Sequence, residues 1–210
     1  MKKTIITLAA LAGFASVSQA QNVRFGVKAG ATGSISTMSK PIYSNVQDKF
    51  GLGAYAGGLA EISFIKKSDK FKLQVEALFN LTNLQSDMKR GGFNQSLNMG
   101  VQSVSVPLLA KYFFTPRFSL YAGPTANFNL GAKSKLDIGG STTKSDLGSE
   151  LNSFQLGGMV GVNYYVWKGL FVEAKFHAVM PDLTTPDAIS ITPTYGTINN
   201  ISLGLGFKFK

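Results

Sequence analysis

Strict alternation of apolar and polar residues is the feature that most constrains the fold of this chain. In the clearest segment, one face carries Phe71, Leu73 and Val75, and the other face carries Lys72 and Gln74. Side chains alternate between the two faces of a β-strand, whereas a helix repeats every 3.6 residues. The pattern therefore predicts β-strands, and it recurs in eight segments: 23–32, 54–64, 71–81, 103–112, 118–130, 154–164, 170–178 and 201–209.

The connections between these segments alternate in length. The short ones are 65–70, 114–117 and 165–169, and the long ones are 33–51, 83–99, 131–149 and 180–197. Short turns at one end and long loops at the other are typical of an up-and-down barrel in an outer membrane. We therefore predict an all-β fold, an eight-stranded antiparallel transmembrane β-barrel, with both chain ends on the periplasmic, short-turn side.

The composition indicates that the apolar faces point outward. Charged residues are only 15% of the chain, and glycine is frequent, with 23 residues. A water-soluble surface normally carries more charge, since about a quarter of residues in soluble proteins are charged. A soluble barrel with the apolar side chains packed inside is the alternative.

Aromatic residues gather near the short turns and the chain ends, as in the interfacial girdle of a membrane barrel. The predicted girdle consists of Phe25, Phe64, Phe71, Tyr112, Phe114, Phe118, Tyr164, Trp167, Phe207 and Phe209. Packing of turn-adjacent aromatics into a soluble core is the competing interpretation.

The N-terminus has the three parts of a secretory signal peptide. Lys2 and Lys3 form a basic region, an apolar run follows, and Ser18-Gln19-Ala20 is a small-x-small cleavage signal. We predict a signal peptide at 1–20 and a barrel domain at 21–210. The chain has no cysteine, which excludes disulfides and thiolate metal sites.

With the apolar face in lipid, the inner face carries charges that need partners in so narrow a space. We predict an ion-pair and hydrogen-bond network in the lumen. Its residues are Arg24, Lys28, Glu61, Lys72, Glu76, Lys111, Glu173, Lys175, His177 and Lys208. A narrow conduit for protons or small ions is the alternative use of these residues.

Catalytic, metal and cofactor sites are not indicated. His177 is the single histidine, and its sequence neighbourhood lacks the partners of a hydrolytic triad, so we assign it to hydrogen bonding in the lumen. Glycines 157, 158 and 161 lie in a strand pattern and are not a phosphate-binding loop. The net charge of +10 falls to +8 without Lys2 and Lys3 of the predicted signal peptide, and this excess lies mainly in the short turns and the lumen, which does not suit a nucleic-acid groove.

Two prolines fall within predicted strands. Pro107 and Pro124 lie on either side of the turn at 114–117 and would each remove a ladder hydrogen bond. We expect a β-bulge there.

Several stretches resemble the Bacteroidetes-type outer-membrane β-barrel proteins, the porin-family or PorT-like barrels. They are Val104–Phe113, Leu120–Pro124, Arg24–Gly30 and Gly169–Phe176. The resemblance covers residues 21–210 and implies an integral outer-membrane protein, with one branch tied to protein secretion. It carries no catalytic residues. Barrels of this kind commonly end on an aromatic residue, whereas this chain ends Phe209-Lys210.

The first functional hypothesis is a non-enzymatic outer-membrane barrel that serves envelope structure or surface contact. Its partners would be outer-membrane lipids and no nucleic acid, and it would need no cofactor. The alternatives are an adhesion or ligand-binding module that uses the four long loops, and an accessory of protein secretion. A lipid-modifying enzyme based on His177 ranks last.

Overall fold

The computed structural model describes residues 23–36, 46–49, 51–63, 70–90, 93–138, 141–146, 154–180 and 198–209. The predicted signal peptide and Phe64 lie outside these residues. No helix in the described ranges is long and apolar enough to cross a membrane.

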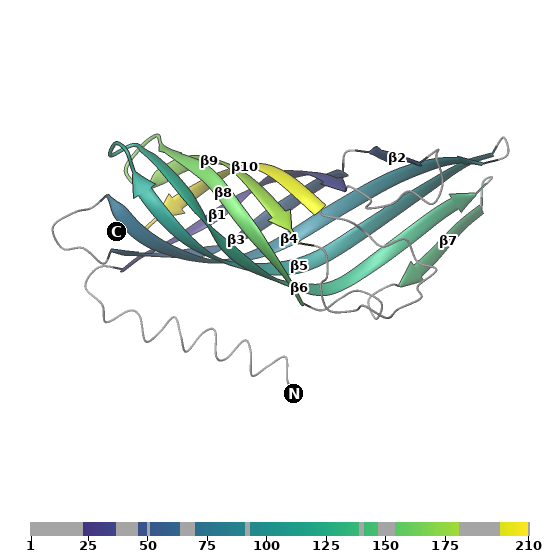
Figure 1. Ribbon diagram of the computed structural model, residues 1–210, viewed down its shortest axis with the longest axis horizontal. Coiled ribbons are helices and arrows are strands. Elements are labelled where there is room, and N and C mark those ends of the chain that lie inside the picture. The colour runs from purple at the N-terminus through teal and green to yellow at the C-terminus, as the bar shows by residue number, and fades with distance from the viewer. Residues whose placement is uncertain are drawn as a thin grey trace, which may run out of the picture.

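Within the described residues, eight long antiparallel strands close into a barrel (Figure 1). They are β1 (Val23–Ser36), β3 (Gly51–Ser63), β4 (Phe71–Arg90), β5 (Phe93–Phe113), β6 (Phe118–Ile138), β8 (Phe154–Tyr165), β9 (Leu170–Val179) and β10 (Ile198–Lys208). Strand β1 pairs with both β3 and β10, and the pairing of β4 with β5 completes the ring. The predicted fold class is confirmed.

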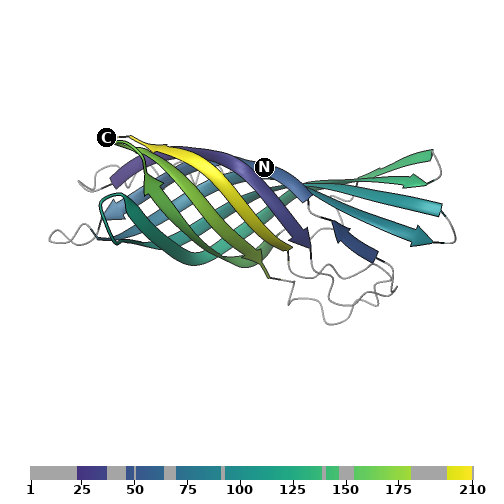
Figure 2. The same ribbon diagram turned by 90° about the horizontal axis from the view of Figure 1, so that it is seen from above.

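Two short strands extend the sheet beyond the ring. Strand β2 (Val46–Lys49) pairs with β4, and β7 (Ser141–Asp146) pairs with β6. In Figure 2, β4, β5, β6 and β7 run well past the ends of the other barrel strands. We call this end of the molecule the projecting end, and the opposite end the short-turn end.

The short-turn end has tight connections at 114–117 and 165–169, where the sequence predicted them, and the third predicted short connection, 65–70, lies outside the described residues except for Lys70. In the β5–β6 turn, Thr115 Oγ1 accepts a hydrogen bond from the Phe118 backbone N–H at 3.0 Å. In the β8–β9 turn, Gly169 has φ of +85°, a conformation that residues with a Cβ rarely adopt. Both turns lie at the same end of the barrel in Figure 1.

The prediction that 83–99 and 131–149 are loops is wrong for most of their length. Strand β4 continues to Arg90, β5 begins at Phe93, and β6 continues to Ile138. In β4 the positions in line with the outward Leu81 become polar, at Asn83, Gln85 and Asp87, and strand pairing continues because it needs only backbone partners. The ranges 33–51 and 180–197 fall largely outside the described residues, apart from the ends of β1 and β3, β2, and Met180.

The predicted bulge at the prolines is also wrong. Pro107 pairs with Thr125, and Ala110 pairs with Ala122, so the register is the same on both sides of Leu108 and Pro124. The register shift between β5 and β6 lies instead between Gln102 and Ser103. A proline removes one donor without adding a residue, so it interrupts the ladder but does not displace it.

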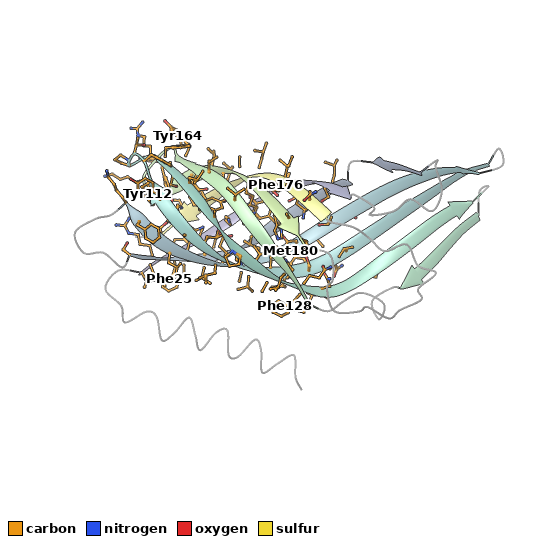
Figure 3. All side chains as sticks on the ribbon, viewed as in Figure 1. Phe25, Tyr112, Phe128, Tyr164, Phe176 and Met180 are labelled. Atoms are coloured by element: carbon orange, nitrogen blue, oxygen red, sulfur yellow. The ribbon has the colours of Figure 1, made fainter. Side chains whose placement is uncertain are left out.

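The apolar faces point outward, as predicted. On β10, Leu203 and Leu205 are 66% and 59% exposed, whereas Ser202 and Lys208 on the same strand are buried. Large hydrophobic side chains are exposed in the same way along β4, β5, β6, β8 and β9 (Figure 3). The described core inside the ring therefore consists mainly of polar side chains and tyrosines, together with a few buried apolar residues: Leu59, Leu78, Leu109, Met159 and Phe171.

Candidate functional site: the barrel lumen and its rims

A central cluster of buried charges occupies the middle of the lumen. Lys28 from β1 donates to Glu76 on β4 at 2.7 Å and to Glu173 on β9 at 2.9 Å. All three side chains have zero exposure. Lys175 adds a second cation, with its Nζ at 3.5 Å from Glu173. The central cluster thus contains two lysines and two glutamates and is electrically balanced.

Two tyrosines complete the hydrogen bonding of Glu173. The Tyr55 hydroxyl donates to Glu173 Oε1 at 2.6 Å, and the Tyr121 hydroxyl donates to Oε2 at 3.1 Å. Strand glycines make room for these rings. A Cβ at Gly204 or Gly161 would overlap the hydroxyl of Tyr55 or Tyr121, respectively. The glycine-rich inner face therefore allows large side chains to cross a narrow lumen.

A second cluster lies toward the short-turn end and is not balanced. Glu61 accepts a hydrogen bond from Lys72 at 3.0 Å and one from Lys208, and Lys111 lies at 3.4 Å. We call these four residues the basal cluster. It contains three buried lysines and one buried glutamate.

Neutral acceptors surround Lys111. Its Nζ donates to Gln74 Oε1 and to the Tyr165 hydroxyl, each at 3.0 Å. The Asn163 amide, oriented with its oxygen toward the ammonium, accepts at 2.7 Å. Gln74 in turn donates to Glu76, which links the basal cluster to the central cluster. Lys111 therefore has its donors satisfied.

Toward the projecting end, the lumen contains uncharged polar groups. His177 Nε2 lies 3.0 Å from Thr125 Oγ1 and is buried. Ser105 links Asn80 and Asn127 through hydrogen bonds of 2.9 and 2.7 Å. In the described part of the chain, no group of three or more histidines, cysteines or acids could hold a metal ion. Among the described residues, the hydrogen-bond partner of His177 is the Thr125 hydroxyl and not an acid.

The structure brings together nine of the ten residues predicted for the lumen, with Arg24 exposed at the short-turn rim. Lys175 Nζ has no hydrogen bond among the described residues and lies 3.3 Å from the centre of the Tyr55 ring. Tyr55, Tyr121, Gln74 and Tyr165 are hydrogen-bonding partners that the sequence analysis missed. Their place on the inner face of alternating strands could have identified them.

Two cavities lie on opposite sides of the central cluster. Along β4, Lys72 lines a cavity of about 1090 Å³ at the short-turn end, and Asn80 lines one of about 50 Å³ toward the projecting end. Glu76 lies between them on the same strand and lines neither cavity. The described side chains thus separate the two cavities.

The described girdle residues, which exclude Phe64, lie on the outer surface or at the rim of the short-turn end. Tyr112, Phe114 and Trp167 are exposed, and Phe25, Tyr112 and Tyr164 lie toward that end in Figure 3. The exposed aromatics there also include Phe71, Phe118, Phe207 and Phe209.

A second band of exposed aromatics, which the sequence analysis did not identify, lies nearer the projecting end. Phe79 and Phe128 each pair with Val104, and Phe128 also pairs with Phe154, 5.3 Å away between ring centres. Phe118 and Phe128 are ten residues apart, about 33 Å along the strand and about 25 Å across a bilayer at a tilt of about 40°. That spacing matches the apolar band of a membrane barrel. The sequence could have predicted this second band, because these phenylalanines occupy outward positions in the alternation of their strands.

Comparison with known proteins shows that the chain is similar to outer-membrane barrel proteins. Residues 18–178 match a family model described as an outer membrane protein beta-barrel domain. The crystal structure of Ail, the attachment invasion locus protein of Yersinia pestis, is similar at 12% identity and a TM-score of 0.51, covering 90% of this chain and 100% of Ail. No curated protein sequence matches the chain.

Two further structures are similar. Ail in complex with the heparin analogue sucrose octasulfate has 13% identity and a TM-score of 0.51, covering 90% of this chain and 100% of that one. OprG from Pseudomonas aeruginosa has 16% identity and a TM-score of 0.43, covering 90% of this chain and 96% of OprG. At these identities the two Ail structures show a shared fold.

Proposed function

The chain belongs to the outer membrane protein β-barrel domain family, and from this premise we propose that it is a non-enzymatic barrel, closed to solutes, that holds a projecting β-sheet at the cell surface. The family places it in the outer membrane, in contact with its lipids. The role of the barrel would be anchorage, and the projecting sheet would make contacts outside the cell.

The central cluster is the observation that carries the proposal of a closed barrel. Lys28, Glu76 and Glu173 meet at 2.7 and 2.9 Å from three different strands, with no exposed surface. An eight-stranded barrel has room only for side chains, whereas water-filled pores need about 16 strands. The cluster also argues against a narrow ion conduit, because an ion would have to displace a fully paired buried lysine.

The projecting sheet supports a role in surface contact. Strands β4, β5 and β6 have 20, 21 and 21 residues, whereas a tilted strand needs only about 9–11 residues to cross a bilayer. The register pairs Arg90 with Phe93, so the β4–β5 hairpin continues to its tip. A sheet outside the membrane would offer backbone edges and side chains to a partner, which is a known mode of recognition.

We also propose an orientation for the barrel from the lengths of its connections. The short turns and both chain ends would face the periplasm, and a signal peptide at 1–20 would direct export. Exported barrels with short periplasmic turns and long outer segments are the rule in this membrane. The projecting end would then lie outside the cell.

Adhesion or ligand binding through the projecting sheet is the finer version of this proposal. Ail, which shares the fold, has been crystallised with a heparin analogue. An accessory role in secretion rests on the resemblance to PorT-like barrels alone, and so does the assignment to a Bacteroidetes-type branch. Residues 84–99 and 134–138 are the part of the sheet to test first for a partner.

Conductance in planar bilayers tests the closed lumen. The purified chain should give no steady channels of solute size, because the central cluster blocks the path. Steady openings large enough for sugars or amino acids would overturn the proposal.

Cysteine labelling tests the orientation, because the chain has no native cysteine. In intact cells, a membrane-impermeant maleimide should label Gly92→Cys, between β4 and β5, and should not label Thr115→Cys in the β5–β6 turn. The second variant should react only after the outer membrane is permeabilised. The reverse pattern would exclude the proposed orientation.

A shortened hairpin tests the surface role. Removal of 84–88 and 95–99 takes out residues that pair with each other, so the rest of the β4–β5 register stays aligned, whereas β2 and residues 134–138 of β6 lose their partners. The variant should keep the heat-dependent gel mobility of a folded barrel and lose binding of whole cells to a surface to which the parent binds. Binding unchanged from the parent would contradict a role for this hairpin.

A further inference from the structure

A basic funnel at the short-turn end is a built cavity that the proposed surface role does not use. Its volume is about 1090 Å³, similar to that of sites for small molecules. Glu61, Lys72 and Lys208 lie at its inner part, and the β5–β6 and β8–β9 turns line its opening.

The charges in this funnel are unbalanced at its base. Three buried lysines, Lys72, Lys111 and Lys208, share the single carboxylate of Glu61. The central cluster next to it has equal numbers of lysines and glutamates. The excess of buried positive charge in the described lumen is therefore concentrated at the base of the funnel. Buried charge without a counter-charge is costly, so an anion bound here would be stabilised.

Lys72 and Lys208 each have more N–H donors than the described residues supply hydrogen-bond acceptors. Each ammonium has three N–H groups, and for both lysines Glu61 is the hydrogen-bond acceptor that the described residues supply. Both residues line the funnel, whereas Lys111 is held by neutral acceptors behind them. Two ammonium groups at one end of a cavity suit an anion that offers several oxygens, such as a phosphate.

The rest of the funnel wall indicates what else such a ligand carries. Arg24, Lys70, Arg117 and Lys168 add positive charge, and Glu61 is the one acid among the described lining residues. The wall also includes the rings of Phe113 and Tyr165, whose centres lie 5.0 Å from Lys72 Nζ and 4.8 Å from Lys208 Nζ, respectively. Trp167 and Phe207 belong both to the wall and to the predicted girdle, so the opening lies at the level of the lipid headgroups.

We propose that the funnel binds an anionic amphiphile, with its phosphate group at Lys72 and Lys208 and its apolar body against the aromatic wall. The same phosphate chemistry could come from a lipid-like phosphate monoester or from free inorganic phosphate. The apolar wall favours the first source. The binding site is separate from the projecting sheet, and it does not depend on the surface role.

Titration of the purified full chain in an uncharged detergent tests this proposal. Trp167 is the single tryptophan and lines the funnel, so its fluorescence reports binding there. Dodecyl phosphate should bind saturably at one molecule per barrel. Inorganic phosphate should bind at least about tenfold more weakly, because it lacks the apolar body. Dodecylphosphocholine, with the same chain but no net charge, should bind similarly weakly.

Matched variants separate the site from general charge effects. Lys72→Gln and Lys208→Gln should each weaken binding of dodecyl phosphate by about tenfold, the size expected for a charged hydrogen bond. Lys208→Arg keeps the charge and should stay within about threefold of the parent. Lys133→Gln removes one charge from an exposed position on β6 outside the funnel and should have no effect.

Three results would overturn the proposal. One is the absence of saturable binding in a parent protein that shows the gel mobility of a folded barrel. Another is equal affinity for dodecyl phosphate and inorganic phosphate, or for dodecyl phosphate and dodecylphosphocholine. The third is a loss in Lys133→Gln as large as that in the two funnel variants, each checked for folded-state mobility.

Discussion

Replacement of Lys28 by methionine should strongly destabilise the barrel. Lys28 Nζ is the shared partner of Glu76 at 2.7 Å and Glu173 at 2.9 Å, with none of the three side chains exposed. Methionine keeps much of the length of the side chain but none of its charge. Lys175 would then be the one cation close to two buried carboxylates in the central cluster.

The magnitude follows from the cost of an unpaired buried charge. Removal of one partner of a buried pair costs about 3–5 kcal/mol, since the remaining charge stays out of water. Glu173 keeps hydrogen bonds from Tyr55 and Tyr121. Most of the energetic cost should therefore fall on Glu76. Glu76 Oε2 already has no hydrogen bond among the described residues.

A second substitution should therefore rescue the variant to different extents. Lys28→Met combined with Glu76→Gln leaves Lys175 and Glu173 as a balanced pair and should recover at least half of the loss. Lys28→Met combined with Glu173→Gln should recover less. A single amide oxygen would replace the two oxygens to which the Tyr55 and Tyr121 hydroxyls donate.

Urea unfolding in phosphatidylcholine vesicles, followed by Trp167 fluorescence, measures these free energies. Lys133→Met, a change at an exposed position on β6, is the control and should shift the free energy by less than about 0.5 kcal/mol. A loss below about 1 kcal/mol for Lys28→Met would refute the reasoning. So would an equal or better rescue by Glu173→Gln than by Glu76→Gln.

Three further changes test other parts of the structure in the same assay. Leu203→Lys places a charge on the outward face of β10 and should cost about 2–4 kcal/mol. Asn83→Lys, at an exposed position toward the projecting end, should change stability little. Equal effects would contradict the inference that Leu203 lies in the membrane and Asn83 lies beyond it. Gly169→Ala should cost more than about 1 kcal/mol because of the positive φ, and an unchanged midpoint would exclude that conformation. Gly206→Ala should cost about 1–3 kcal/mol because its Cβ would meet the Phe171 ring, and Phe171→Leu should recover part of the loss; no recovery would point to another cause.

The strand number and the two faces of the barrel could be predicted because the bilayer enforces them. In β4, the alternation of Phe71 and Leu73 with Lys72 and Gln74 records which residues meet hydrocarbon and which do not. Every membrane-crossing segment experiences the same constraint, so the pattern is strong. The Gly-rich inner face was part of the same pattern.

The projecting strands could not be predicted from a continuous outward apolar face, because in β4 that face ends with polar residues at Asn83, Gln85 and Asp87. A different signal was present in the sequence. The register leaves Gly91-Gly92 between Arg90 and Phe93, and Gly139-Gly140 between Ile138 and Ser141. Two glycines between paired strands are typical of a two-residue hairpin turn. A search for such turns would have revealed both extensions.

The composition of the lumen was predictable, whereas its contacts were not. Lys28 meets Glu76 and Glu173 across sequence separations of 48 and 145 residues. Those contacts depend on the register of several strands and on the closure of the ring, which a single sequence does not specify. The imbalance of the basal cluster is likewise a property of the assembled barrel.

The buried charges also explain why this chain adopts one register. A slip of one residue in β1 would turn Lys28 toward hydrocarbon, at a cost of about 2–4 kcal/mol near the midplane, and would separate it from Glu76 and Glu173. A purely apolar lumen would impose no such penalty, because both faces of each strand would then tolerate lipid. The central cluster costs desolvation energy in the native barrel, but it costs far more in any shifted one. We therefore infer that its ion pairs contribute less to stability than to the choice of a single strand alignment.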